Sequence, residues 1–222
     1  MTLSDRQLAS LKALLFLACL IPAANLAWGV YADTLGANPI EAVTRCLGKW
    51  ALSFLLITLC VTPLRRFTGW PWIGRLRRML GLYTFFYACL HVTSYLWFDQ
   101  FFDWQEIAKD ILKRPFITLG FIAFCLLVPL AVTSNKAMIR RLGGRRWQDL
   151  HRTVYAIAII AVVHFSLMVK KDLTQPLLYG IGLALLLGLR GFWLYREKQK
   201  QLAGAYMPSK PKGRIIPIVS KR

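Results

Sequence analysis

Six long apolar segments constrain the fold of this chain more than any other feature of its sequence. A helix needs about 20 mostly apolar residues to cross the hydrocarbon core of a membrane. The segments extend roughly over residues 8–31, 50–64, 79–98, 115–132, 150–169 and 177–195. Polar loops separate them, and the alternating pattern of transmembrane strands is absent. The sequence therefore predicts an all-α membrane protein built as a bundle of six transmembrane helices.

The apolar segments divide the chain into three parts. We expect a cytoplasmic N-terminal tail over residues 1–7, a transmembrane domain over residues 8–195 and a basic cytoplasmic tail over residues 196–222. The first apolar segment is longer than the apolar core of about 7–15 residues in a signal peptide, so we expect it to stay as a membrane anchor. The five cysteines form no CxxC pair, which argues against a zinc site or a disulfide framework.

The charge of the chain predicts how the helices are oriented. There are 29 Lys+Arg against 10 Asp+Glu, a net charge of +19. In a soluble domain this excess would indicate nucleic-acid binding, but a hydrophobic content of 56% favours a membrane protein with basic loops. With the N-terminus in the cytoplasm, 22 of the basic residues fall on the cytoplasmic side, in residues 1–12, 65–78, 134–152 and 190–222. The positive-inside rule therefore predicts that both termini are cytoplasmic.

Two of the three histidines are expected at the same depth in the membrane. His91 and His164 lie about 12 and 14 residues from the starts of two segments that run in the same direction, and therefore about 20 Å from the inner edge. Ionisable side chains in hydrocarbon are costly and mark functional sites. Two imidazoles at one depth suit a b-type heme, whose iron takes one nitrogen from each side. The alternative is that each imidazole only bonds a neighbouring helix.

The third histidine, His151, lies 13 residues before His164, at the cytoplasmic interface and level with Arg77 and Arg78. It is a candidate ligand for a second heme iron, or alternatively an interfacial residue that caps a turn. An ideal helix would place His151 and His164 about 140° apart around its axis, which counts against two hemes on one face. Arginine keeps its proton and ligates iron poorly, so Arg77 and Arg78 are candidates for binding a heme propionate or a flavin phosphate.

Two other classes of membrane protein compete with a b-heme electron carrier. A transporter with proton-relaying histidines would normally show acidic residues inside its helices or inverted repeats. Here the helix interiors are almost free of Asp and Glu, and seven of the ten acidic residues fall in the loops assigned to the outside. A heme-free scaffold for a larger complex is the second alternative.

Short motifs along the chain carry a family resemblance. They are LGANP at residues 35–39, TPLR at 62–65, RRMLGL at 77–82, LH at 90–91 with SY at 94–95, RPFITLG at 114–120, Trp147, LH at 150–151, VY at 154–155 and His164. In this order they resemble the ferric reductase-like transmembrane family, and within it the heme-binding membrane subunits of bacterial periplasmic methionine sulfoxide reductase systems. The larger relatives place two histidines on each of two helices, whereas this chain has one on the third segment and two on the fifth.

The resemblance implies a function and a set of partners. It implies heme b and FMN as cofactors, a bacterial inner membrane location, and an electron-transfer subunit of an oxidoreductase system rather than its catalytic subunit. Electrons would come from the quinol pool or a cytosolic flavin reductase and pass to a periplasmic molybdenum enzyme that reduces methionine sulfoxide. A nicotinamide-binding domain would carry a GxGxxG motif, and residues 196–222 hold none. We therefore expect the electrons to come from a separate donor. Residues 65–78, rich in arginine, are the candidate FMN site. Another ferric-reductase-type heme b oxidoreductase is the alternative.

Overall fold

Helices make up all the regular structure in the part of the chain that the computed structural model describes, residues 3–169 and 172–206. In chain order they are α1 (Asp5–Tyr31), α2 (Pro39–Thr68), η1 (Pro71–Leu76), α3 (Arg77–Ser94), η2 (Tyr95–Asp99), α4 (Trp104–Lys113), α5 (Pro115–Val132), α6 (Lys136–Leu142), α7 (Gly144–Arg152), α8 (Val154–Met168) and α9 (Thr174–Tyr206). No strand occurs among these residues. The predicted all-α class is therefore confirmed.

Five stretches of helix are long and apolar enough to cross a membrane. They are Asp5–Tyr31, Pro39–Thr68, Pro115–Val132, Gly144–Met168 and Thr174–Ala203. The sixth expected span, α3, is not among them, because its 18 residues begin with Arg77 and Arg78 and also include polar residues such as Thr84, His91 and Ser94. Thr84 and Ser94 are buried against neighbouring helices. A helix surrounded by other helices can be more polar than one that faces lipid.

The chain divides into two units, residues 1–187 and residues 188–222. In the second unit the structure describes the last part of α9, up to Tyr206, so the basic tail is described only in part and residues 207–222 lie outside the described residues. At the other end of the chain, α1 begins at Asp5, inside the expected N-terminal tail.

Helix α2 is longer than the apolar segment that predicted it. The sequence indicated an end at Thr62–Pro63, but the helix continues through Pro63 to Thr68. A proline has no backbone N–H, so one hydrogen bond of the helix is missing, but the helix can continue beyond it. The helix ends at Gly69, which adopts the left-handed conformation with φ 69° and donates its N–H to the carbonyl of Arg65.

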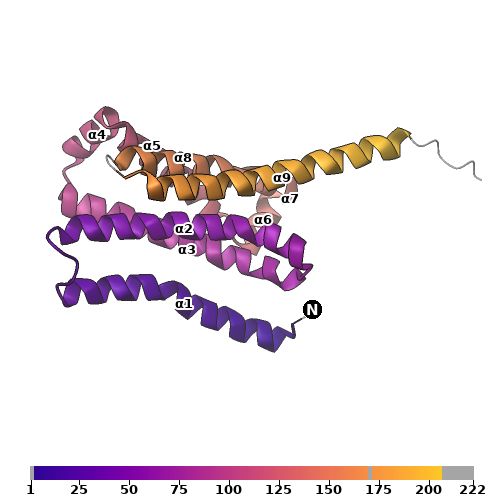
Figure 1. Cartoon of the computed structure of the whole chain (residues 1–222), viewed down its shortest axis with the longest axis horizontal. Coiled ribbons are helices and arrows are strands. Elements are labelled where there is room, and N and C mark those ends of the chain that lie inside the picture. The colour runs from indigo at the N-terminus through magenta and orange to yellow at the C-terminus, as the bar shows by residue number, and fades with distance from the viewer. Residues whose placement is uncertain (1–2, 170–171, 207–222) are drawn as a thin grey trace, which may run out of the picture. The chain divides into compact units, whose positions relative to one another are not determined.

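Two helix pairs form the centre of the first unit: α2 packs along α3, and α5 packs along α8 (Figure 1). One cluster of buried apolar side chains joins α2, α5, α8 and the start of α9. A second cluster joins α1, α2, η1 and α3. Since α2 contributes to both clusters, it holds the two halves of the core together.

The chain also separates basic from acidic segments. The N-terminus of α1, η1 with the start of α3, and helices α6 and α7 lie at one end of the first unit (Figure 1). The α1–α2 turn and α4 lie at the opposite end (Figure 1). The first set coincides with the arginine-rich segments 65–78 and 134–152. Segments that the charge count assigned to one compartment thus lie together.

Two tyrosines of α3 attach α1 to the bundle through its backbone. The Tyr83 hydroxyl donates to the carbonyl of Phe16 at 2.8 Å. Tyr87, which is completely buried, donates to the carbonyl of Cys19 at 2.8 Å and accepts from the N–H of Ala23 at 3.2 Å. These are the two backbone groups that an undisturbed helix would pair with each other. The Tyr87 hydroxyl therefore bridges the α1 ladder beside Pro22, where proline already weakens it.

We expect Tyr87→Phe to loosen α1 locally, because it leaves the backbone groups of Cys19 and Ala23 without their bridging hydroxyl. Leaving buried polar groups unpaired costs about 1–3 kcal/mol, which corresponds to amide exchange about 5- to 150-fold faster. Hydrogen–deuterium exchange of peptides covering residues 16–27 measures this change. The control is Tyr31→Phe, at the exposed end of α1. Unchanged exchange in Tyr87→Phe would show that the backbone hydrogen bonds of α1 are maintained without the hydroxyl.

Candidate functional site

The His91 side chain is held between α3 and α2. Its Nδ1 atom lies 2.9 Å from the backbone carbonyl oxygen of Thr44. One turn further along α2, Gly48 faces the same ring, and a Cβ added there would lie 3.0 Å from Cε1 of His91. The imidazole can approach α2 this closely because residue 48 has no side chain. The Ser94 hydroxyl donates to Thr44 Oγ1 at 3.0 Å and supports the same contact.

The His164 side chain is held in the same way between α8 and α5. Its Nδ1 atom lies 2.6 Å from the backbone carbonyl oxygen of Phe116, in the first turn of α5. Gly120 follows four residues later, and a Cβ added there would lie 2.9 Å from Cε1 of His164. Each histidine therefore uses a carbonyl and, four residues on, a glycine of the neighbouring helix. The same arrangement therefore occurs twice, once between α2 and α3 and once between α5 and α8.

These contacts determine which ring nitrogen is free to bind a metal. A carbonyl oxygen can only accept a hydrogen bond, so Nδ1 of His91 and of His164 must carry the proton. Nε2 of each neutral ring then keeps a lone pair that can ligate a metal. Histidines that ligate metals usually donate their other N–H to a carbonyl or carboxylate, which fixes the orientation of the ring. Both histidines have this arrangement.

The two imidazoles lie directly beside each other in the bundle. Their ring centres are 6.3 Å apart, and the ring planes are inclined at 73°. A metal–imidazole bond is about 2 Å long, and a ring nitrogen lies about 1 Å from the centre of its ring. Two imidazoles on opposite sides of one metal ion therefore have centres about 6 Å apart. The structure brings the two histidines together, as their matched depth predicts, at a separation that fits a shared metal ion.

His151 has a different environment. It lies in the last turn of α7, and its Nδ1 is 3.0 Å from the backbone carbonyl of Trp147. The Trp147 ring stacks on the imidazole with centres 3.9 Å apart. The Leu130 carbonyl is also close to the ring, but Nε2 of His151 is buried and has no hydrogen-bond partner within the described part of the chain. A buried nitrogen with a free lone pair fits a ligand of a second heme iron.

The helix that carries His151 and His164 is not uniform between them. The fifth apolar segment is interrupted at Thr153, which separates α7 from α8. The Leu150 carbonyl accepts from both the N–H of Thr153, at 3.1 Å, and its hydroxyl, at 2.7 Å. An i→i+3 turn rotates the chain by about 120° rather than 100° per residue, so the angle of an ideal helix holds only approximately between the two histidines.

The arginines predicted to bind anionic groups begin α3. The guanidinium of Arg77 is half-buried and close enough to His151 for its charge to act on the ring. Arg78 is exposed. Arg75, just before them, pairs with Asp5 at 3.1 Å. The structure thus brings Arg77 to His151 and leaves Arg78 at the surface.

Sequence reasoning missed the positions opposite the histidines: Thr44, Gly48, Phe116 and Gly120. A glycine inside an apolar helix is a usable signal, because small residues mark close helix approach in membranes. The carbonyls of Thr44 and Phe116 give no such signal, since every residue has one. Only the packing of α2 on α3 and of α5 on α8 identifies them.

Comparisons with known proteins identify the family of the chain. The model of the ferric reductase-like transmembrane component family matches residues 47–162, which cover most of α2 through most of α8. The chain therefore belongs to the ferric reductase-like transmembrane family, a class of multi-pass membrane proteins.

Within that family the chain is similar to proteins named protein-methionine-sulfoxide reductase heme-binding subunit MsrQ. The relative from Azospira oryzae is 59% identical over 188 residues, 84% of this chain and 81% of the relative. The relative from Herminiimonas arsenicoxydans is 54% identical over 202 residues, 90% of this chain and 93% of the relative. The relative from Rhodospirillum rubrum is 54% identical over 175 residues, 79% of this chain and 84% of the relative.

Proposed function

We propose that this chain is the heme-binding membrane electron-transfer subunit of a methionine sulfoxide reductase system. His91 and His164 hold one b-type heme through their Nε2 atoms. The observation that carries the proposal is the pair of imidazoles with ring centres 6.3 Å apart, each with Nδ1 on a backbone carbonyl. The names of the relatives, heme-binding subunits, support it.

When bound, a b-type heme supplies reversible one-electron chemistry, and two imidazole ligands suit electron transfer rather than oxygen binding. The residues of the chain orient the ligands. The carbonyls of Thr44 and Phe116 hold the Nδ1 protons, and Gly48 and Gly120 let the rings approach the adjacent helices. Because these contacts already orient both imidazole rings, the side chains would need to move little when the iron binds.

We propose His151 as the ligand of a second heme iron. Its buried, unpaired Nε2 and the stacked Trp147 ring support this role. Arg77, close to the imidazole, would pair with a propionate. Exposed Arg78 and the arginine-rich segment 65–78 would bind the phosphate of FMN.

The proposed electron route crosses the bacterial inner membrane. Electrons come from the quinol pool or a cytosolic flavin reductase and go to MsrP, a periplasmic molybdenum-containing methionine sulfoxide reductase, in support of the repair of oxidised periplasmic proteins. The concentration of arginines at one end of the first unit supports cytoplasmic termini. Helix α3, with η2, would be the sixth span, since it packs along α2 and buries its polar residues.

An absorption spectrum of the purified protein tests the proposal. We expect a Soret band of b type that shifts on reduction with dithionite, and a pyridine hemochrome assay should give at least one heme per chain, or two if His151 also binds. A protein with no such band would be a heme-free scaffold or a transporter. To separate the proposal from another ferric-reductase-type oxidoreductase, the reduced protein is mixed with MsrP or with a ferric chelate. Faster reoxidation by MsrP is the expected result.

A further inference from the structure

Helix α4 is an amphipathic helix that lies outside the histidine site. It follows η2 and lies at the end of the first unit that also holds the α1–α2 turn (Figure 1). Only Arg114 separates it from α5, so α4 cannot move far from the surface of the membrane. Its position is set by the two helices between which it is tethered, α3 and α5.

The side chains of α4 divide into three faces, because successive residues are rotated by about 100°. Ile107 is buried against the bundle, and Ile111 is half-buried beside it. One flank of this face is apolar and exposed: Trp104, Ala108 and Leu112, with Trp104 68% and Leu112 85% exposed. The opposite flank is polar and also exposed: Glu106, Lys109 and Lys113. Within the described part of the chain this apolar flank is therefore largely exposed.

An aromatic turn, residues 97–104, continues this apolar flank. Its exposed rings are Trp97, Phe98, Phe101, Phe102 and Trp104. Several of these rings contact each other, with ring centres 6.1 Å apart for Trp97–Phe102 and 6.3 Å apart for Phe102–Trp104. The exposed apolar surface of α4 and that of the turn are therefore continuous at Trp104.

The backbone of this turn is strained. Phe101 and Phe102 both adopt positive φ angles, 46° and 59°, which bulky residues rarely do. A strained backbone conformation persists where other interactions offset its free-energy cost. Phe101 is 79% exposed, so the compensation does not come from burial of its ring inside the protein.

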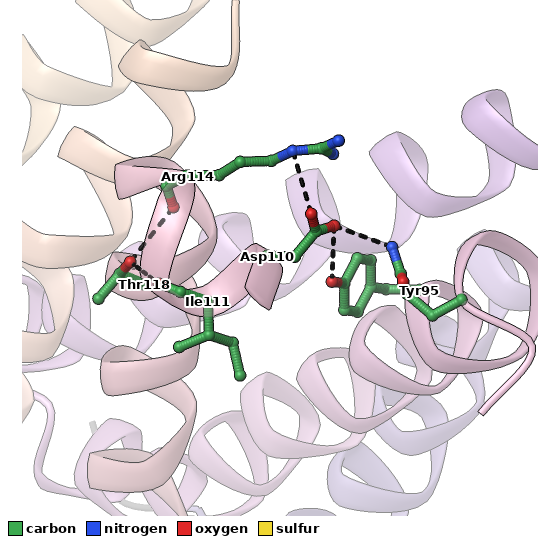
Figure 2. Close-up of polar contacts among 6 residues, drawn as sticks. Tyr95, Asp110, Ile111, Arg114 and Thr118 are labelled. Atoms are coloured by element: carbon green, nitrogen blue, oxygen red, sulfur yellow. Dashed lines mark hydrogen bonds and ion pairs between the residues drawn. The ribbon is translucent and has the colours of Figure 1, made fainter. Parts of the chain in front are cut away.

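Polar contacts fix the orientation of α4 on the bundle. The Asp110 carboxylate, whose side chain is 13% exposed, accepts from the Tyr95 hydroxyl at 3.3 Å and from Gln100 Nε2 at 2.9 Å (Figure 2). It also pairs with Arg114 at 3.2 Å. The Thr118 hydroxyl donates to the carbonyl of Ile111. These bonds attach the C-terminal half of α4 to η2 and α5, and the buried side chain of Ile107 adds a contact nearer its start, so the apolar flank faces a fixed direction.

We propose that α4 and the aromatic turn lie in the interface between membrane and water, with lipid covering the apolar flank and the aromatic rings. Tryptophan and other aromatic residues concentrate at this depth, and amphipathic helices with one apolar and one charged flank lie in the plane of the interface. Lipid is favoured over a protein partner because α4 is tethered directly to helices that cross the membrane, and its polar flank leaves lysines for the headgroups and water. The inference does not depend on heme binding.

Nitroxide labels on the two flanks test this placement in the full chain. Ala108→Cys lies on the apolar flank and Glu106→Cys, two residues away, on the polar flank; both positions are exposed. Cys125, the one exposed cysteine of the five, is first replaced by alanine. The labelled proteins are placed in vesicles of phosphatidylethanolamine and phosphatidylglycerol. Collision with oxygen, which enriches in lipid, is compared with collision with a water-soluble nickel chelate. Leu112→Cys provides a second apolar position.

We expect the ratio of oxygen to nickel accessibility to be several-fold higher for Ala108→Cys and Leu112→Cys than for Glu106→Cys. If the labels on both flanks meet the nickel chelate equally, lipid does not cover the flank and the proposal fails. Protection of Ala108→Cys only after addition of the periplasmic reductase would instead assign this surface to a protein partner. High oxygen accessibility on both flanks would overturn the interfacial orientation.

Discussion

Replacing His91 or His164 by alanine is expected to remove most of the heme from the purified protein. Each substitution deletes one of the two nitrogens that we propose bind a shared iron, and a single remaining imidazole holds a heme far less firmly. The heme content per chain, from the pyridine hemochrome assay, should fall to nearly zero if the His91–His164 heme is the only one, and by about half if a second heme binds independently at His151. The reduced-minus-oxidised spectrum measures the loss independently.

His151→Ala is the matched comparison. Its Nδ1 is bound by the Trp147 carbonyl of its own helix and by neither partner of the other two histidines, so its removal should leave the signal of the His91–His164 heme intact. Any loss should be limited to a second heme. Three alanine variants that keep the same heme content would refute the assignment of all three histidines. A folded protein is verified by an unchanged profile on size-exclusion chromatography.

Gly120→Ala is expected to have the second largest effect, although it changes only one methyl group. The added Cβ would lie 2.9 Å from Cε1 and 3.0 Å from Nδ1 of His164. Contacts this short force the ring or α5 to move, and overpacking of this kind costs about 1–3 kcal/mol. If the cost falls on the bound geometry of His164, heme affinity decreases about 5- to 150-fold. Gly48→Ala should act in the same way on His91, where the Cβ would lie 3.0 Å from Cε1.

Two glycines elsewhere in helices serve as controls for the substitution itself. At Gly182 in α9 an added Cβ meets nothing within 4 Å, and at Gly81 in α3 it meets Thr58 at 3.8 Å, an ordinary contact. Alanine at these positions should leave heme content unchanged and slightly favour the helix. Heme titration of the apoprotein compares the four variants. Equal affinities in Gly120→Ala and Gly182→Ala would show that the close approach to His164 is not required.

Much of this molecule could be predicted from local properties of the sequence. Apolar segments of sufficient length predict helices that cross a membrane, because an isolated helix satisfies its own backbone in lipid. The constant rise of a helix converts residue number into depth, so the counts to His91 and His164 predict that the rings lie level. The structure agrees, with centres 6.3 Å apart. The order of the short motifs correctly predicted the family.

Other features depend on how distant segments pack. The carbonyl that receives Nδ1 of His91 lies 47 residues away, and the one for His164 lies 48 residues away. Nothing local distinguishes Thr44 or Phe116, because the contact exists only once α2 meets α3 and α5 meets α8. The continuation of α2 through Pro63 likewise shows that a single local signal did not decide where the helix ends.

The sequence by itself determined the helical class, five of the segments that can cross a membrane and the matched depth of two histidines. These follow from composition, length and the fixed geometry of a helix. Only the tertiary structure decided which nitrogen of each imidazole is free, which glycines make room for the rings, and where the exposed flank of α4 lies. Those properties belong to contacts between helices, and such contacts arise from packing in three dimensions rather than from any one segment.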